Sequence, residues 1–172
     1  MDRLVFLDES GVNLAQTRLY GRAPSDERVI DYVPDARFER KTILVSVKLN
    51  GQMSSLLFGG ALNGKLFIQY IKEFLSQILK EGDIVVLDNC TAHKVAGVKK
   101  AIEACGAKAL YLPAYSPDFN PVELLWSKVK AILRREKART FDALEKALKL
   151  ALDSVSVNDI VGWFKHCGYS VC

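Results

Sequence analysis

Two short apolar runs in this sequence each end in an aspartate. Residues 4–7 (LVFL) are followed by Asp8, and residues 84–87 (IVVL) are followed by Asp88. Four-residue apolar runs of this kind are typical of strands that are buried on both faces of a parallel sheet. Ligands bind such sheets at the carboxyl ends of the strands, so we expect both aspartates at one functional edge.

The rest of the apolar pattern predicts an α/β fold. Alternation over 42–49 predicts a strand with one apolar face, and Asn50-Gly51 predicts a hairpin turn into a second strand near 53–61. Residues 10–40 are expected to form a loop with short extended pieces. A short strand is predicted at 109–112, and helices at 64–80, 94–105, 121–136, from 140, and near 157–166. The order β, β, β, α, β, α, β, followed by two or three helices, predicts a mixed five-stranded sheet with an antiparallel hairpin, flanked by helices.

Composition indicates one globular domain and suggests its cellular location and the class of its partner. The 172 residues are 49% hydrophobic, without an apolar run long enough to span a membrane. We find no signal-peptide pattern, and the four cysteines lack the spacing of a disulfide framework or a zinc site, so we expect a cytoplasmic location. Residues 93–139 hold ten Lys or Arg against four Asp or Glu, while the remainder holds fourteen against sixteen. This asymmetry suits a polyanionic partner.

A third carboxylate, Glu123, lies in the first turn of a predicted helix, and it has two interpretations. Asn120 is a favoured N-cap, so Glu123 could bond back to it in a capping box. On a helical wheel, however, Ser127, Lys130 and Arg134 lie within about 40° of Glu123. A carboxylate followed by a cationic stripe favours phosphate contacts, and we expect these three residues to bind DNA near the site.

Three carboxylates at one edge predict a metal site. Asp8, Asp88 and Glu123 would repel each other unless a cation lay between them, which points to metal-dependent phosphodiester chemistry. Either aspartate taken alone is more often a turn former or a helix cap, but the pair favours a site because both close similar buried runs.

Several residues beside the carboxylates are candidates for supporting roles. Glu9 and Asn89 directly follow the two aspartates and are expected to support them or to belong to the loops. His93 could orient a ligand or contact a phosphate, or it could cap the next helix. Asn120 precedes the acidic helix. Trp126 is expected to pack that helix against the core rather than to stack on a base.

Together these motifs resemble the DDE catalytic domain of mariner-type transposases, specifically their bacterial insertion-sequence relatives. Asp88 and Glu123 are separated by 34 residues, a spacing found in that superfamily. The blocks that carry the resemblance are FLDESG at 6–11 with YGRAP at 20–24, VLDN at 86–89 with His93, LPAYSPDFNPVE at 112–123, and Trp126 with Lys130.

The resemblance implies a ribonuclease H-like fold in which Asp8, Asp88 and Glu123 form the catalytic and metal-binding triad. It implies two Mg²⁺ ions, with Mn²⁺ as a substitute, and cleavage and joining of phosphodiester bonds at transposon ends. The expected partners are DNA, as transposon ends and target, and further copies of the chain in a homodimer or higher assembly, with no membrane. Helix-turn-helix modules precede this domain in the family, so we expect residues 1–172 to be a single catalytic domain without that DNA-binding region. An inactive remnant that binds DNA or protein, and a nuclease without strand transfer, are the alternatives.

Overall fold

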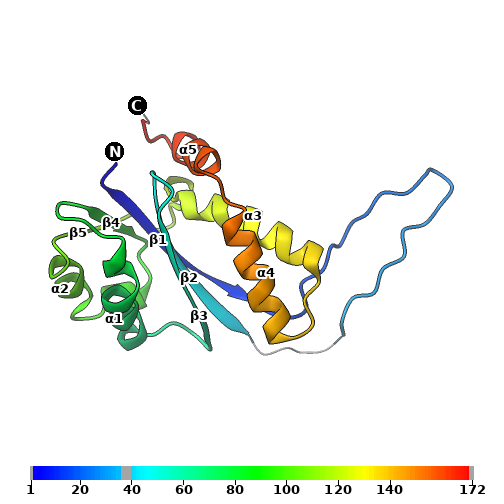
Figure 1. Ribbon diagram of the computed structural model, residues 1–172, viewed down its shortest axis with the longest axis horizontal. Helices are drawn as coiled ribbons and strands as arrows, with labels where there is room; N and C mark the ends of the chain where they lie inside the picture. Colours follow the sequence, from blue (N-terminus) through cyan, green and yellow to red (C-terminus); the bar gives the residue numbers. More distant parts are fainter. Residues whose placement is uncertain (1, 36–39, 171–172) are drawn as a thin grey trace.

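The computed structural model describes residues 2–35 and 40–170. At its centre is a five-stranded sheet with the strand order β3-β2-β1-β4-β5 (Figure 1). The strands are β1 (Leu4–Val12), β2 (Lys41–Lys48), β3 (Met53–Gly59), β4 (Ile84–Leu87) and β5 (Lys108–Tyr111). β1 pairs antiparallel with β2 and parallel with β4, and β3 completes an antiparallel hairpin with β2. The predicted mixed sheet is therefore confirmed.

Helices cover both faces of the sheet (Figure 1). One layer holds α1 (Gly64–Glu73) and α2 (Val98–Glu103), and the other holds α3 (Pro121–Glu136), α4 (Phe141–Asp153) and α5 (Val157–His166). The described residues also contain three 3₁₀ turns, η1 (Leu75–Gln77), η2 (Thr91–Lys94) and η3 (Pro117–Phe119). Side chains alternate along β1, so Val5 and Leu7 pack in the α1–α2 layer while Phe6 packs in the α3–α5 layer. None of the described helices is long and apolar enough to cross a membrane.

Strand β1 is longer than the sequence predicts. It continues to Val12, because it remains paired with β2 after β4 has ended, so Asp8 lies within the strand rather than at its end. Phe6 is opposite Val86 in the parallel ladder. Two residues further along, this register brings Asp8 level with Asp88, so both still reach one edge.

Two predicted helices are shorter in the structure. The helix predicted at 64–80 ends at Glu73 and continues as the 3₁₀ turn η1. The helix predicted at 94–105 begins only at Val98, because Gly97 has a φ of 104°, a left-handed conformation outside the helix.

Strand β2 is buried on both faces, where the alternating pattern predicted one. Helices cover both sides of the sheet at this point, so Lys48 is only 2% exposed. Its ammonium lies 2.6 Å from Oδ2 of buried Asp83, which also accepts the backbone N–H of Lys80. The polar positions of β2 are therefore satisfied inside the protein.

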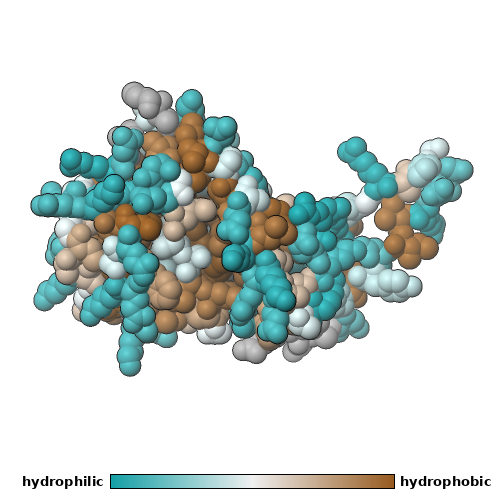
Figure 2. Space-filling model, in the orientation of Figure 1, coloured by the Kyte–Doolittle hydropathy of each residue, from teal (hydrophilic) through white to brown (hydrophobic). Residues whose placement is uncertain are grey.

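Residues 13–35 form an arm without helix or strand that leaves the body between β1 and β2 (Figure 1). Brown, apolar surface is visible on this arm (Figure 2). Its root is held by Arg139, which donates to the carbonyls of Leu14 and Gln16, and by an ion pair between Lys137 and Asp31. The large apolar side chains exposed along it are Leu19, Tyr20, Val29, Ile30, Tyr32 and Val33.

Candidate active site

The three predicted carboxylates line one cavity of about 540 Å³. Strand β1 contributes Asp8, the end of β4 contributes Asp88, and the first turn of α3 contributes Glu123. Asp8 has the same parity as Phe6 along β1, so its side chain faces the layer that contains α3. The other lining residues are Asn89, Lys94, Asn120 and residues 112–117.

Asp8 is buried and held by two hydrogen bonds. Its Oδ1 accepts the backbone N–H of Glu9 at 2.8 Å, and its Oδ2 accepts Nδ2 of Asn120 at 3.1 Å. Burial, followed by the negative charge of Glu123, raises the pKa of Asp8 to about 7. Ionising this carboxyl at neutral pH is therefore costly unless a positive charge is near.

His93 fixes Asp88 from behind the cavity. The imidazole is completely buried, its Nδ1 lies 2.6 Å from Asp88 Oδ1, and its ring lies against Phe67 with centroids 4.5 Å apart. Nε2 is 3.2 Å from Oε2 of Glu9, off the direction of a good hydrogen bond, so this contact is an ion pair. Glu9 reaches it because it points to the opposite face of β1 from Asp8.

The contacts of His93 determine the protonation states of His93 and Asp88. Burial alone would lower the pKa of His93, but its contacts with Asp88 and Glu9 outweigh burial and raise that pKa to about 9. The hydrogen bond from His93 in turn lowers the pKa of Asp88. His93 is thus a buried cation that orients Asp88 and keeps it ionised. Because it is inaccessible, it does not contact phosphate or cap a helix toward solvent.

Glu123 does not form the capping box. The N–H of Asn120 donates to the carbonyl of Pro117 at 2.8 Å, while Oδ1 of Asn120 accepts the N–H of Val122 at 3.1 Å. Asn120 therefore caps α3 and binds Asp8 with the same amide group. Within the described residues no hydrogen bond reaches the exposed Glu123 carboxylate, which leaves both of its oxygens free for a ligand.

The chemistry of these donors fits a hard divalent cation. Carboxylate oxygens are the ligands that Mg²⁺ and Mn²⁺ prefer, and a cation would relieve the repulsion that raises the pKa of Asp8. Across residues 2–35 and 40–170, however, no group of three or more Asp, Glu, His or Cys side chains is gathered at metal-binding distance. Protein donors contact both oxygens of Asp8 and one of Asp88, while Asp88 Oδ2 and Glu123 have no donor among the described residues. Each oxygen of Asp8 accepts a single hydrogen bond and keeps a second lone pair for a cation.

The predicted DNA-binding residues of α3 lie away from this cavity. Lys130 and Arg134 line a separate hollow of about 270 Å³ beside the root of the arm, together with Asn13 and residues 15–17. A helix rises 1.5 Å per residue, so Arg134 is about 16 Å along α3 from Glu123. They therefore do not line the carboxylate cavity, and their contact with DNA phosphates near it stays a prediction. Ser127 is exposed on the same helix, and Trp126 is 3% exposed in the core, so it packs the helix as predicted.

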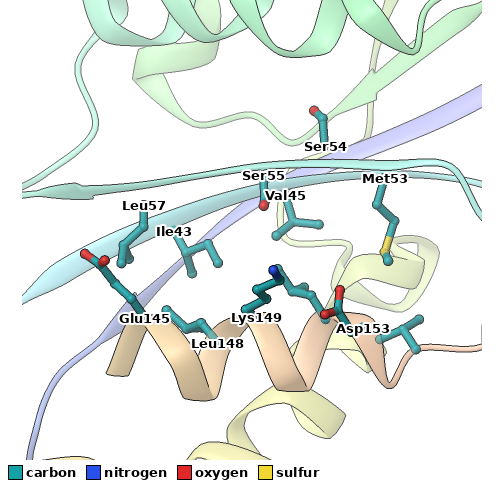
Figure 3. A pocket seen from close by; sticks show the side chains of 12 residues that line it. Ile43, Val45, Met53, Ser54, Ser55, Leu57, Glu145, Leu148, Lys149 and Asp153 are labelled. Atoms are coloured by element: carbon teal, nitrogen blue, oxygen red, sulfur yellow. The ribbon is translucent and has the colours of Figure 1, made fainter. Parts of the chain in front are cut away.

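A cavity of similar size, about 580 Å³, lies between β3 and α4 (Figure 3). Its floor is apolar, with Leu57 and Leu148 facing each other across it, and Glu145, Lys149 and Asp153 of α4 lie beside it. It contains no histidine, no cysteine and no carboxylate from a strand end. The cavity lined by the three carboxylates is therefore the better candidate for chemistry.

Residues 3–145 match the family model of DDE superfamily endonucleases, which is most of the chain. This chain belongs to the DDE endonuclease superfamily. No curated protein sequence matches it significantly.

The DDE domain also shares its fold with solved transposase structures. The Mos1 transposase paired-end complex with left transposon end has a TM-score of 0.76 and 18% identity, covering 95% of this chain and 52% of that one. The mariner Mos1 paired-end complex with Mg gives 0.71 and 16%, over 96% and 53%. The catalytic domain of Mos1 mariner transposase gives 0.66 and 16%, over 95% and 76%. The fold is thus the ribonuclease H-like fold of these proteins, and the chain spans about half of the Mos1 chains in the complexes.

Two further residues of the DDE domain line the cavity: Lys94, which the sequence analysis did not name, and Tyr115, which it named only as part of the block at 112–123. Lys94 directly follows His93 and places a cation in the cavity wall, where its charge contributes to lowering the pKa of Asp88. Tyr115 lies in the loop that closes the cavity and is fully exposed. A lysine in a turn and a tyrosine in a loop are ordinary by sequence, so only their place beside the carboxylates distinguishes them.

Proposed function

We propose that this chain is the catalytic domain of a mariner-type DNA transposase, which cleaves and joins phosphodiester bonds at transposon ends. The observation that carries the proposal is the convergence of Asp8, Asp88 and Glu123 on one cavity, from three elements far apart in sequence. Membership of the DDE endonuclease superfamily and the fold shared with Mos1 support it.

In this proposal the three carboxylates hold two Mg²⁺ ions, or Mn²⁺ in their place. When bound, such ions activate a water or a DNA 3′-hydroxyl and stabilise the leaving oxygen. His93 keeps Asp88 ionised and orients it, and the hydrogen bond from Asn120 orients the carboxylate of Asp8. Lys94 supplies a positive charge in the wall for a phosphate oxygen.

The proposed partners are transposon-end and target DNA and further copies of the chain. The basic character of residues 93–139 supports a polyanionic partner. Exposed apolar side chains on the arm, such as Ile30 at 82%, support assembly with another protein surface. We propose a homodimer or a higher assembly in the active state.

The test is metal-dependent nicking of a supercoiled plasmid by the purified chain. We expect nicking with Mg²⁺ or Mn²⁺ and none with a chelator. Asp88→Asn and Glu123→Gln should abolish nicking while the fold is retained, because each removes an anionic ligand. Glu145→Gln is the matched control, since its carboxylate lies beside the other cavity. A wild-type chain that never nicks, or full activity in both variants, contradicts the proposal.

Strand transfer needs its own measurement. A pre-cleaved DNA end with a free 3′-hydroxyl, supplied with a target plasmid, should yield joined products. Nicking without joining would identify a nuclease, and calorimetry that detects no Mn²⁺ binding would identify an inactive remnant.

A further inference from the structure

Tyr115 is presented to solvent at the mouth of the carboxylate cavity in an unfavourable conformation. Its relative exposure is 102%, the highest of the large apolar side chains that the structure describes. Its φ is 56°, in the left-handed region that a bulky residue avoids for steric reasons. The positive φ costs free energy of folding, and because the ring is wholly exposed, no packing of the side chain within the described residues offsets that cost.

The loop that carries Tyr115 is fixed at both ends to the site itself. At one end, the N–H of Leu112 donates to the carbonyl of Leu87 at 2.8 Å, and the side chain of Asn89 donates to the carbonyl of Leu112. At the other end, Asn120 binds Asp8. Prolines at 113 and 117 restrict the residues between. The loop is therefore a rigid support that holds its apex beside the carboxylates.

A structural role explains the other left-handed residue but not this one. Among the described residues, Lys137 is the second non-glycine residue with a positive φ, at 50°. It terminates α3, and its N–H donates to the carbonyl of Leu133, as helix ends require. The Tyr115 side chain makes no hydrogen bond within the described residues and packs against nothing, because it is wholly exposed.

We propose that Tyr115 stacks on a nucleobase beside the phosphate that enters the carboxylate cavity, an inference that rests on the proposed function. Every base has a π-face, so an aromatic ring on a rigid support binds unpaired or frayed bases without reading their sequence. Because Tyr115 lines the same cavity as Asp8 and Glu123, a DNA strand bound there reaches the ring. Tyr115 would thus position the strand for cleavage.

Three substitutions separate stacking from a role in folding. Tyr115→Phe keeps the ring and should nick plasmid at the wild-type rate. Tyr115→Ala should lose about tenfold in nicking, the loss typical of one stacked base. Tyr115→Gly should lose as much activity yet unfold at a higher temperature, because glycine accepts the positive φ. Leu150→Ala is the matched control, since it removes an exposed apolar side chain of α4 away from the cavity and should leave nicking unchanged.

A binding cycle identifies the base as the partner. The probe is a short duplex with a 3′ overhang, carrying either normal bases or abasic sites in the overhang, bound in Ca²⁺ so that it is not cut. Abasic sites should weaken binding of the wild-type chain about tenfold, because the base that stacks on Tyr115 is missing. They should not change the affinity of Tyr115→Ala, because that variant has no ring on which a base could stack.

The outcomes distinguish this inference from the proposed function. A wild-type chain that nicks or binds DNA, with Tyr115→Ala equal to it, overturns the stacking role alone. The same tenfold abasic penalty in both proteins also overturns it. A wild-type chain that neither nicks nor binds DNA overturns the proposed function first.

Discussion

Replacing Asp8 by asparagine should stabilise the metal-free protein at neutral and alkaline pH. Burial and the charge of Glu123 raise the pKa of Asp8 from 3.8 to about 7, so the folded state retains a proton that the unfolded chain has already lost. Stability conferred by the wild-type residue therefore falls as pH rises from about 4 to about 7. Asparagine is neutral throughout this range and escapes the decline.

The size of the effect follows from the shift and the hydrogen bonds. A shift of about three pKa units corresponds to about 4 kcal/mol once the unfolded carboxyl is fully ionised. Asparagine still accepts the N–H of Glu9, but its NH₂ group then faces Nδ2 of Asn120, which loses one hydrogen bond worth about 1 kcal/mol. The variant should therefore match the wild type near about pH 4.5 and exceed it by about 3 kcal/mol near about pH 8.

The assay is urea denaturation of both proteins in a chelating buffer at several pH values. The informative quantity is the difference in unfolding free energy between variant and wild type, because other titrating groups cancel in it. Glu123→Gln provides a second test, since removing its charge should move the Asp8 titration to lower pH. Mg²⁺ should then stabilise the wild type more than Asp8→Asn, because the ion binds the carboxylate.

Two results would refute this reasoning. A stability difference that does not change with pH would show that Asp8 has an ordinary pKa in the folded protein. A variant less stable than the wild type at about pH 8 would show that the hydrogen bonds of Asp8 outweigh its electrostatic cost.

Three further predictions concern other charged groups. Because its pKa is raised to about 9, His93 gives stability that is fully present below about pH 6.5 and lost as pH rises through about 9; urea denaturation of His93→Gln should lack that loss. Lys130→Ala should weaken binding to all DNA sequences alike and reduce the slope of log affinity against log salt concentration by about 0.9. Lys128→Ala is the control and should keep the slope, because the ammonium of Lys128 is held in an ion pair with Asp159. Lys48→Met should cost about 3–5 kcal/mol in urea denaturation, because it leaves Asp83 buried without its counter-charge, and adding Asp83→Leu should recover most of that loss.

Most strands of the sheet were predictable because residues close together in the sequence specify them. Buried runs at 4–7 and 84–87 and the hairpin turn at Asn50-Gly51 each specify a strand from a few neighbouring residues. The extension of β1 to Val12 was not, because it depends on pairing with β2 across the arm. The burial of Lys48 escaped prediction for the same reason, since its counter-charge is Asp83, 35 residues away.

The candidate site was predictable to the level of its elements but not of its contacts. Strand ends and a helix start are visible in sequence, and they place Asp8, Asp88 and Glu123 at one cavity. The bond between His93 and Asp88 and the ion pair with Glu9 depend on packing across the sheet. Helical period alone grouped Lys130 with Glu123, because a wheel ignores the length of the helix.

The adjacent residues Asp8 and Glu9 of strand β1 connect the cavity on one face of the sheet with the packing on the other face. One carboxylate faces the cavity beneath α3, and the next faces a histidine that lies against Phe67 of α1. Substitutions that change the packing beneath α1 would therefore shift the imidazole of His93 and, with it, the carboxylate of Asp88. Libraries intended to improve the thermal tolerance of this domain should leave Phe67 fixed, or screen every change there for metal affinity as well as for folding.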